Sequence, residues 1–277
     1  MLPATFARIQ TLVRDRSAIV LEPGKEYLVE ARLSPIARAH GLANIDELCL
    51  RVERGHRQLE DDVVEAMTTN ETSFFRDYYP FAALREQIIP EMRTLRGSQR
   101  RLDIWCAASS TGQEPYSIAM LLADHFPDLV ATWNINILAT DLSRAVLSKA
   151  RAGRYRQPEV NRGTEAQHLI NHFTRDGMDW VLKDHIRKMV RFEPLNLIGN
   201  WPMMGPFDLI FVRNVLIYFD ADAKCKILDR AAGRLQRDGY LFLGGAETPP
   251  TNHTLFERLP LPRAGAYRLA QRRAGER

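Results

Sequence analysis

The 277-residue sequence predicts an α/β protein in which a doubly wound, mostly parallel sheet follows an all-α N-terminal domain and contains a small antiparallel β insertion. Three observations support this prediction. Residues 1–65 show only helical spacing of apolar side chains, residues from about 81 onward alternate apolar runs with helical patterns, and this alternation stops between about 155 and 195. Alternating strands and helices are typical of a parallel sheet with helices on both faces.

The N-terminal domain is predicted from two runs, Phe6 to Val13 and Leu28 to Ile36, in which apolar side chains recur at helical spacing. Gly24 lies between the two runs, where a helix is expected to end. We therefore assign residues 1–65 to a helical domain and residues 66–80 to a linker that contributes to a ligand site.

Residues 81–277 form the predicted sheet domain. The expected strands are Leu102–Ala107, Ile135–Thr140, Leu209–Val212 and Tyr240–Leu243, and the expected helices lie near residues 115–126, 143–152 and 221–236. Two further strand-like runs, Trp180–Leu182 and Ile186–Phe192, are divided by the polar residues 183–185. They predict a small antiparallel subdomain at about 155–195.

Composition limits the classes of partner. The 38 Lys and Arg residues are interspersed with 34 Asp and Glu residues, and the net charge of +4 is too weak to indicate a nucleic-acid partner. The three cysteines lack metal-type spacing, and His168 and His172 have no accompanying third ligand, so no metal is expected. Without a signal peptide or a long apolar run, we expect a soluble cytoplasmic protein with no membrane insertion.

The loop after the first predicted strand is the most informative segment. Ala107 to Ser110 and Gly112 are small enough to let the backbone approach a ligand closely, Glu114 can accept hydrogen bonds, and Pro115 suits the first helical position. The loop lacks the G-x-G-x-x-G phosphate cradle, which argues against NAD and FAD. The pattern favours a nucleoside without pyrophosphate, such as S-adenosylmethionine, over a purely structural turn.

Asp141 closes the second predicted strand, where an acid commonly accepts the ribose hydroxyls of a bound nucleoside. The alternative is that Asp141 caps the helix beginning near Ser143. Together with the small-residue loop, the ribose role is the preferred interpretation.

Two other segments carry polar side chains at positions suited to a ligand site. In the first, residues 70–77, Thr69 or Thr72 can instead cap a helix, and Arg76 can instead form a surface ion pair. The second places Arg213, Asn214 and Tyr218 after a buried strand, where open α/β sheets bind ligands; the alternative is that the Tyr218 ring only packs.

Four motifs resemble the bacterial chemotaxis-receptor methyltransferases: Met67–Arg76, Ala108–Ser117, Ala139–Asp141 and Phe211–Phe219. The resemblance spans nearly the whole chain and includes Gly24–Glu30. It implies a Rossmann-like class I methyltransferase sheet. It also implies a protein-glutamate O-methyltransferase that uses S-adenosylmethionine, releases S-adenosylhomocysteine and forms glutamyl methyl esters on chemotaxis receptors during sensory adaptation.

The resemblance also implies a set of site residues. The cofactor-binding positions would be Asn70, Thr72, Arg76, Glu114, Asp141, Asn196, Leu197, Arg213 and Asn214. Asp141 would hold the ribose, Asn196 would lie near the adenine, and the catalytic residues Arg76 and Tyr218 would lie beside the transferring methyl group.

The expected partner is the acidic signalling helix of a methyl-accepting receptor. Opposite it we expect a basic face in the helical domain, formed by Arg32, Arg38, Arg51, Arg54 and Arg57 at helical spacing. The alternative is a solvated helix surface.

The sequence departs from the family pattern in two places. Gly244–Glu247 replaces a loop that in many members carries His and Ser. In addition, Arg175–Met178 is shorter than the corresponding loop of members that bind a C-terminal receptor tether, so binding of a tether pentapeptide is not expected.

Overall fold

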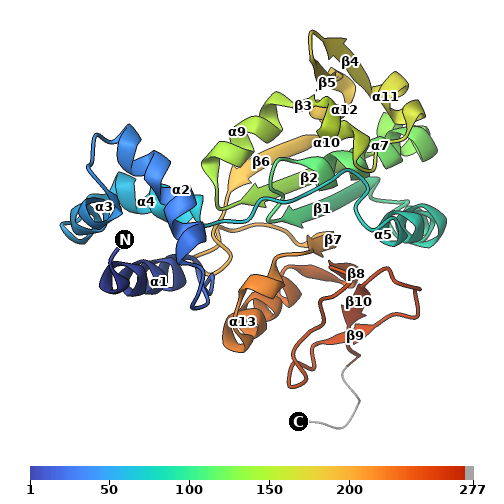
Figure 1. Cartoon of the computed structure of the whole chain (residues 1–277). Helices are drawn as coiled ribbons and strands as arrows, with labels where there is room; N and C mark the ends of the chain where they lie inside the picture. The colour runs from blue at the N-terminus through green and yellow to red at the C-terminus, as the bar shows by residue number, and fades with distance from the viewer. Residues whose placement is uncertain (272–277) are drawn as a thin grey trace.

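A computed structural model describes residues 1–271. The helical domain lies to one side of the sheet domain, and the small second sheet lies at the end of the molecule away from the C-terminal strands (Figure 1). The helical domain consists of α1 (Pro3–Ser17), α2 (Glu26–Ala39), α3 (Ile45–Glu53) and α4 (Arg57–Ala66). Their apolar faces meet around Val13, Leu33, Leu48 and Val63, all fully buried, so this block has a core of its own.

Two short helices and one π-helical turn connect the helical domain to the sheet. They are α5 (Tyr79–Ala83), the turn Leu84–Ile88, and α6 (Ile89–Leu95). Residues 67–78 between α4 and α5 form no regular helix or strand.

The main sheet has seven strands in the order β6-β2-β1-β7-β8-β10-β9. The strands are β1 (Arg101–Ala107), β2 (Asn134–Asp141), β6 (Val190–Pro194), β7 (Phe207–Val212), β8 (Leu235–Leu243), β9 (Phe256–Arg258) and β10 (Ala266–Leu269). The first five in this order pair in parallel, and β10 runs antiparallel to both its neighbours. In register, Ala107 lies between Thr140 and Val212, so the carboxyl ends of β1, β2 and β7 meet at one edge.

Helices cover both faces of this sheet, which confirms the doubly wound α/β prediction. They are α7 (Gln113–His125), α8 (Pro127–Thr132), α9 (Arg144–Ala152) and α13 (Ala221–Ala232). Along β1, Ile104 and Cys106 join the core that contains residues of α7 and α9, whereas Trp105 and Ala107 join the core that contains residues of α13. This period of two places apolar side chains on both faces of a buried parallel strand.

The small antiparallel sheet contains β3 (Arg154–Arg156), β4 (Phe173–Asp176) and β5 (Asp179–Leu182) in the order β3-β5-β4. Around it lie α10 (Gln157–Asn161), α11 (Ala166–His172) and α12 (Asp184–Arg187). Among residues 1–271, no helix combines the length and apolar character that crossing a bilayer requires.

The predicted partner of one strand was wrong. The run Ile186–Phe192 does not pair with β5, because α12 occupies its first part and β6 pairs in parallel with β2 in the main sheet. Val190 and Phe192 are buried in the core that also contains residues of α7 and α9. The helix predicted near 221–236 is present as α13, and it ends at Ala232 because β8 begins at Leu235.

Candidate functional site

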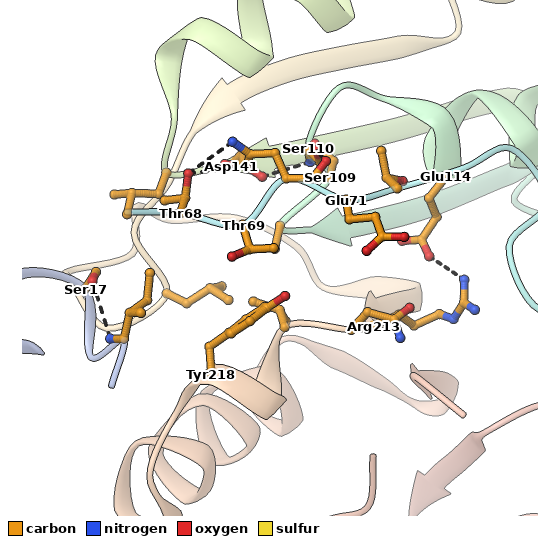
Figure 2. A pocket seen from close by; sticks show the side chains of 18 of the residues that line it. Ser17, Thr68, Thr69, Glu71, Ser109, Ser110, Glu114, Asp141, Arg213 and Tyr218 are labelled. Carbon is orange, nitrogen blue, oxygen red and sulfur yellow. Dashed lines mark hydrogen bonds and ion pairs between the residues drawn. The ribbon is translucent and has the colours of Figure 1, made fainter. Parts of the chain in front are cut away.

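One pocket opens at the carboxyl ends of the parallel strands, the edge at which open α/β sheets bind ligands. Its lining comes from the loops that follow β1, β2, β6 and β7, and from residues 68–76, which cross this edge. Ser17, the last residue of α1, completes the wall on the side of the helical domain (Figure 2). Ile19, two residues later, also lines the pocket.

The ten residues predicted for the site all line this pocket, namely Asn70, Thr72, Arg76, Glu114, Asp141, Asn196, Leu197, Arg213, Asn214 and Tyr218. Ser17, Ile19 and Thr68 also line the pocket, although the sequence analysis did not predict them as site residues. No local signal marks Ser17 or Ile19, because they reach the pocket only through the packing of the helical domain. Thr68 had a signal, since it lies within the motif that contains Asn70.

The loop between β1 and α7 has the close backbone approach expected from its small residues. Ala108 and Ser110 adopt positive φ values of 51° and 49°, and Gly112 has φ 92°. A Cβ on Gly112 would lie 3.0 Å from the Cβ of Ala150, so the loop has no room for a larger residue there. Left-handed non-glycine residues are strained and concentrate at ligand sites.

Asp141 is held by this loop and by the start of the next helix. Its Oδ2 accepts a hydrogen bond from the Ser110 amide at 2.8 Å, and its Oδ1 accepts one from the Ser143 amide at 2.9 Å. The N-cap of α9 is Ser143 itself, whose Oγ accepts from the Val146 amide, so the alternative cap role of Asp141 is wrong. Burial raises the pKa of the Asp141 carboxyl, while the two amides oppose the rise.

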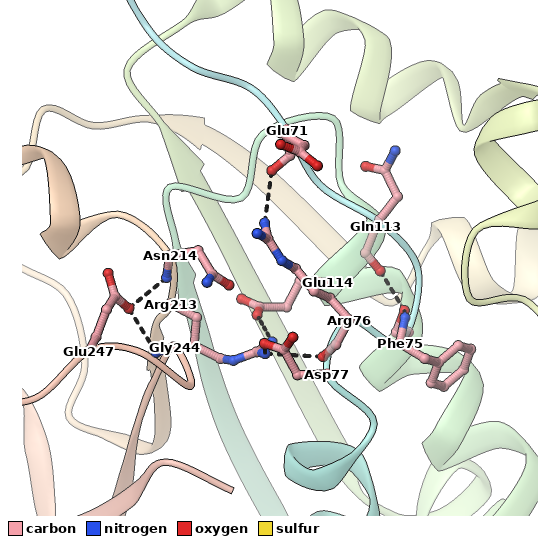
Figure 3. Close-up of polar contacts among 11 residues, drawn as sticks. Glu71, Phe75, Arg76, Asp77, Gln113, Glu114, Arg213, Asn214, Gly244 and Glu247 are labelled. Atoms are coloured by element: carbon pink, nitrogen blue, oxygen red, sulfur yellow. Dashed lines mark hydrogen bonds and ion pairs between the residues drawn. The ribbon is translucent and has the colours of Figure 1, made fainter. Parts of the chain in front are cut away.

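Arg213 binds the crossing segment, residues 68–76, to the edge of the sheet. Its guanidinium donates to Glu114 Oε2 at 2.7 Å, to Asp77 Oδ2 at 2.8 Å and to the carbonyl oxygen of Arg76 at 3.0 Å (Figure 3). Burial raises the pKa of Glu114, and the adjacent Arg213 cation opposes that rise. Arg213 therefore joins the end of β7, the start of α7 and the crossing segment in one buried network.

The crossing segment is also tied down by backbone contacts. The Asn70 carbonyl accepts from Ser110 Oγ at 2.9 Å, and the Phe75 amide donates to Ser117 Oγ at 2.9 Å. Arg76 donates to the Glu71 carbonyl at 3.0 Å and forms no ion pair with a carboxylate within residues 1–271, so the alternative of a surface ion pair is wrong.

Neither Thr69 nor Thr72 caps a helix, because Met67 is the C-cap of α4 and Tyr78 is the N-cap of α5. Both threonines line the pocket, and Thr69 Oγ1 also accepts a hydrogen bond from Arg32 at 3.5 Å.

Two family models match this chain. CheR methyltransferase, all-alpha domain, matches residues 4–68, and CheR methyltransferase, SAM binding domain, matches residues 70–264. Chemotaxis protein methyltransferase 1 of Pseudomonas aeruginosa is 41% identical over 249 residues, which cover 88% of this chain and 90% of that protein. The chemotaxis protein methyltransferase of Vibrio parahaemolyticus is also 41% identical, over 85% of this chain and 86% of its own length.

The chain belongs to the CheR methyltransferase family. It is accordingly an S-adenosylmethionine-dependent methyltransferase of chemotaxis.

The pocket of this CheR-family chain fits its cofactor. Ser109 Oγ and Arg213 Nε are buried without a hydrogen-bond partner among the described residues, and both residues line the pocket. Buried polar atoms are normally paired, so their state suits a polar ligand. Asp141 and Glu114 add acceptors, and the described part of the chain holds no cluster of His, Cys, Asp and Glu suited to a metal ion.

Both polar atoms of the Asn196 side chain form hydrogen bonds within the chain. Its Nδ2 donates to the Arg16 carbonyl at 2.6 Å, and its Oδ1 accepts from the Ile198 amide at 3.1 Å. These bonds fix the orientation of the Asn196 amide and leave it one N–H donor and one acceptor position for a ligand. The contact to Arg16 also ties the end of α1 to the pocket.

The basic face predicted on the helical domain differs from the structure in two respects. Arg32 is turned inward, where its guanidinium donates to the carbonyl oxygens of Met67 at 3.0 Å and Thr68 at 2.9 Å. It therefore holds the start of the crossing segment and is not free to bind an acidic partner.

The second correction concerns the expected spacing. The helix α3 ends at Glu53 and α4 begins at Arg57, with Gly55 at φ 87° between them. Arg54 and Arg57 therefore do not continue the helical face of Arg51. All three remain exposed, as does Arg38 in α2.

Proposed function

We propose that this protein transfers the methyl group of S-adenosylmethionine to glutamate carboxylates on the cytoplasmic signalling helices of chemotaxis receptors, forming glutamyl methyl esters for sensory adaptation. The observation that carries the proposal is the single pocket that gathers all ten predicted site residues at the ligand-binding edge of the sheet. Membership of the CheR family over nearly the whole chain limits the reaction to methyl transfer in chemotaxis.

Within the pocket, we assign the ribose to Asp141 and the adenine to the Asn196–Leu197 loop. The Asp141 carboxylate is oriented by two amides, and each of its oxygens retains a free acceptor position for a ribose hydroxyl. Asn70, Thr72, Glu114, Arg213 and Asn214 complete the cofactor site. The cofactor supplies a methyl group on a sulfonium, which is electrophilic without a metal.

The chemistry requires little of the protein besides alignment. A glutamate side chain has an ordinary pKa of about 4.3 and is ionised at neutral pH, so no general base is needed. One carboxylate oxygen forms the bond to the methyl carbon as the carbon–sulfur bond breaks, and no proton moves. Correct placement of two reactants can contribute about 7–11 kcal/mol to lowering such a barrier.

Arg76 and Tyr218 are proposed to provide that alignment. The Arg76 guanidinium is a cation in the pocket lining that pairs with no carboxylate among the described residues, so it can attract either the substrate carboxylate or that of the cofactor. Tyr218 lies in the short turn that follows β7, where its hydroxyl or ring edge can face the sulfonium.

The receptor is proposed to lie across the exposed arginines of the helical domain, Arg38, Arg51, Arg54 and Arg57. Receptor helices that carry several glutamates are acidic, and complementary charge increases the rate of encounter. Because these helices lie in the cytoplasm, we place the enzyme there.

Radiolabelled S-adenosylmethionine tests the proposal. Incubation with receptor-containing membranes should transfer label to the receptor, and mild base should release it as methanol because esters hydrolyse under those conditions. Base-stable label, or label on a small molecule or RNA, would instead indicate a methyltransferase of another substrate. Cofactor binding without any transfer would indicate a sensor that keeps the pocket.

A further inference from the structure

Glu247 is a buried acid beside the pocket that the proposed cofactor contacts do not use. Its Oε2 accepts from the Asn214 amide at 2.6 Å and from the Gly244 amide at 2.7 Å, and its Oε1 accepts from the Ile217 amide at 3.2 Å. Only 5% of the residue is exposed, and within residues 1–271 its carboxylate forms no ion pair with a cation.

The Asn214 and Ile217 amides belong to the loop after β7, which carries pocket residues. The Gly244 amide belongs to the loop after β8. Asn214 has φ 57°, a left-handed conformation that costs a non-glycine residue free energy unless its surroundings hold it in place. Ile217 lies in the short 3-10 turn Leu216–Tyr218, so Glu247 pairs an amide of the turn that presents Tyr218. Figure 3 shows the carboxylate between Asn214 and Gly244.

Gly244 is the complementary part of this arrangement. A Cβ at this position would lie 2.6 Å from Glu247 Oε2 and 2.9 Å from the Asn214 amide nitrogen. Only a glycine therefore lets the carboxylate reach all three amides. The neighbouring Gly245 has nothing within 4 Å of an added Cβ, and neither glycine has a positive φ.

A buried carboxylate without a cation is costly, and hydrogen bonds from amides offset that cost only in part. We propose that Glu247 is a positioning residue for methyl transfer, which fixes the Asn214 backbone and the Leu216–Tyr218 turn so that Tyr218 lies correctly beside the reacting atoms. This inference rests on the proposed function of the pocket. It predicts a defect in turnover while the adenosine end, at Asp141 and Leu197, remains intact.

The first variant is Glu247→Gln. Its amide oxygen can still accept from Asn214 and Gly244, but its NH2 group would face the Ile217 amide, donor against donor. We expect kcat for receptor methylation to fall at least about tenfold, since small misplacements of reacting groups cost up to about a hundredfold. The Kd for S-adenosylhomocysteine should rise by a smaller factor than kcat falls, because Asn214 is only one of the proposed cofactor contacts and Asp141 is unaffected.

The second variant, Gly244→Ala, keeps the carboxylate and disturbs the same contacts sterically. It should reproduce the loss of kcat with a smaller change in Kd, whereas the matched control Gly245→Ala should behave as wild type. If Glu247→Gln does not fold, the comparison of Gly244→Ala with Gly245→Ala still tests whether Glu247 is a positioning residue. Equal kcat values for Gly244→Ala and Gly245→Ala, or a loss of cofactor affinity as large as the loss of kcat, would overturn the proposal.

Hydrogen exchange gives a measurement that does not depend on activity. The Ile217 amide should exchange at least about tenfold faster in both variants, and the Asn214 and Gly244 amides should do so in Gly244→Ala, while the amides of β1 keep their protection. Unchanged exchange at all three amides would contradict the positioning role. If wild type methylates no receptor, the proposed function fails, and the exchange measurement still decides whether Glu247 holds this loop.

Discussion

Asp141 illustrates how one residue allows two interpretations until its neighbours are known. The sequence permitted a helix cap or a ribose acceptor, and Ser143 takes the cap of α9. The carboxylate is left oriented by the Ser110 and Ser143 amides, with acceptor positions still open. Its environment therefore favours a ligand role for a physical reason that the strand-end position alone does not supply.

Replacement of Asp141 by Ala should weaken S-adenosylhomocysteine binding by roughly 1–3 kcal/mol, because the ribose hydroxyls lose a charged acceptor. Calorimetry on the folded variant measures this effect. Asp222→Ala, an exposed position in the first turn of α13, serves as the control and should bind as wild type. Unchanged affinity in folded Asp141→Ala would remove the ribose assignment.

The burial of Asp141 also predicts that cofactor affinity depends on pH. Burial raises the pKa of Asp141 above its ordinary 3.8, so on acidification the ionised acceptor is lost at a higher pH than usual. Cofactor affinity in wild type should therefore fall as pH decreases through that raised pKa, and Asp141→Asn should show a flatter profile. Identical profiles would show that Asp141 ionisation is not linked to binding.

Arg76→Ala and Tyr218→Phe should lower kcat more than they alter folding. Both side chains line the pocket and contribute nothing to the buried apolar clusters, and misalignment there can cost about a hundredfold. Steady-state kinetics and thermal unfolding measure the two effects. Arg258→Ala in the exposed part of β9 is the control, and wild-type rates in both test variants would contradict the catalytic placement.

At the scale of elements, apolar patterns predicted strands well and their partners less well. The strands β1, β2 and β7 lie where their apolar runs indicated, because burial on both faces demands such runs. The run Ile186–Phe192 was assigned to the wrong sheet, since a short apolar segment does not specify which neighbour it pairs with.

Charge reversal tests the receptor-facing helices. Arg38→Glu combined with Arg51→Glu should raise the KM for receptor at low salt and leave cofactor affinity unchanged, and high salt should mask the difference. The control is Arg258→Glu in the sheet domain, which should leave the receptor KM as it is. An unaltered KM at low salt in the double variant would show that these arginines form only a solvated surface.

The prediction about a receptor tether concerns the β4–β5 hairpin. Its turn contains only Gly177 and Met178, and the Trp180 indole already donates to Gln157 at 2.8 Å. The edge strand β4 can still pair with a backbone, but we expect so short a turn to contribute little to side-chain pockets for an aromatic-rich peptide. Titration of a tether-type pentapeptide should show no binding at about 100 μM, equivalent to roughly 5.5 kcal/mol. A low-micromolar isotherm would overturn this expectation.

At the scale of the whole molecule, the helical domain meets the sheet domain at the rim of the pocket. Glu65 in α4 accepts from Ser143 Oγ at 2.5 Å and from the Ala145 amide at 2.8 Å, two and four residues after Asp141. The Val20 amide donates to the Tyr218 carbonyl at 3.2 Å. Each contact lies at or near a pocket residue, so domain docking and cofactor binding are expected to be coupled.

Replacement of Glu65 by Ala should therefore weaken S-adenosylhomocysteine binding by about 1 kcal/mol, although Glu65 itself lies outside the pocket lining. Calorimetry on this variant and on Glu22→Ala, an exposed residue of the same domain, makes the comparison. Equal affinities would show that cofactor binding does not depend on the contact that Glu65 makes between the two domains.

The sequence alone determined the α/β class and the positions of β1, β2 and β7, because these depend on local periodicity. Its motifs, through their resemblance to a known family, also indicated the ten predicted site residues, all of which line the pocket. Only the tertiary structure decided that Ser17 and Ile19 complete the wall, that Arg32 is turned inward, and that Glu247 holds the loop of Tyr218. Those contacts join residues 30 or more positions apart. A hydrogen-bonding side chain has many possible partners in the chain, and packing of the domains selects among them.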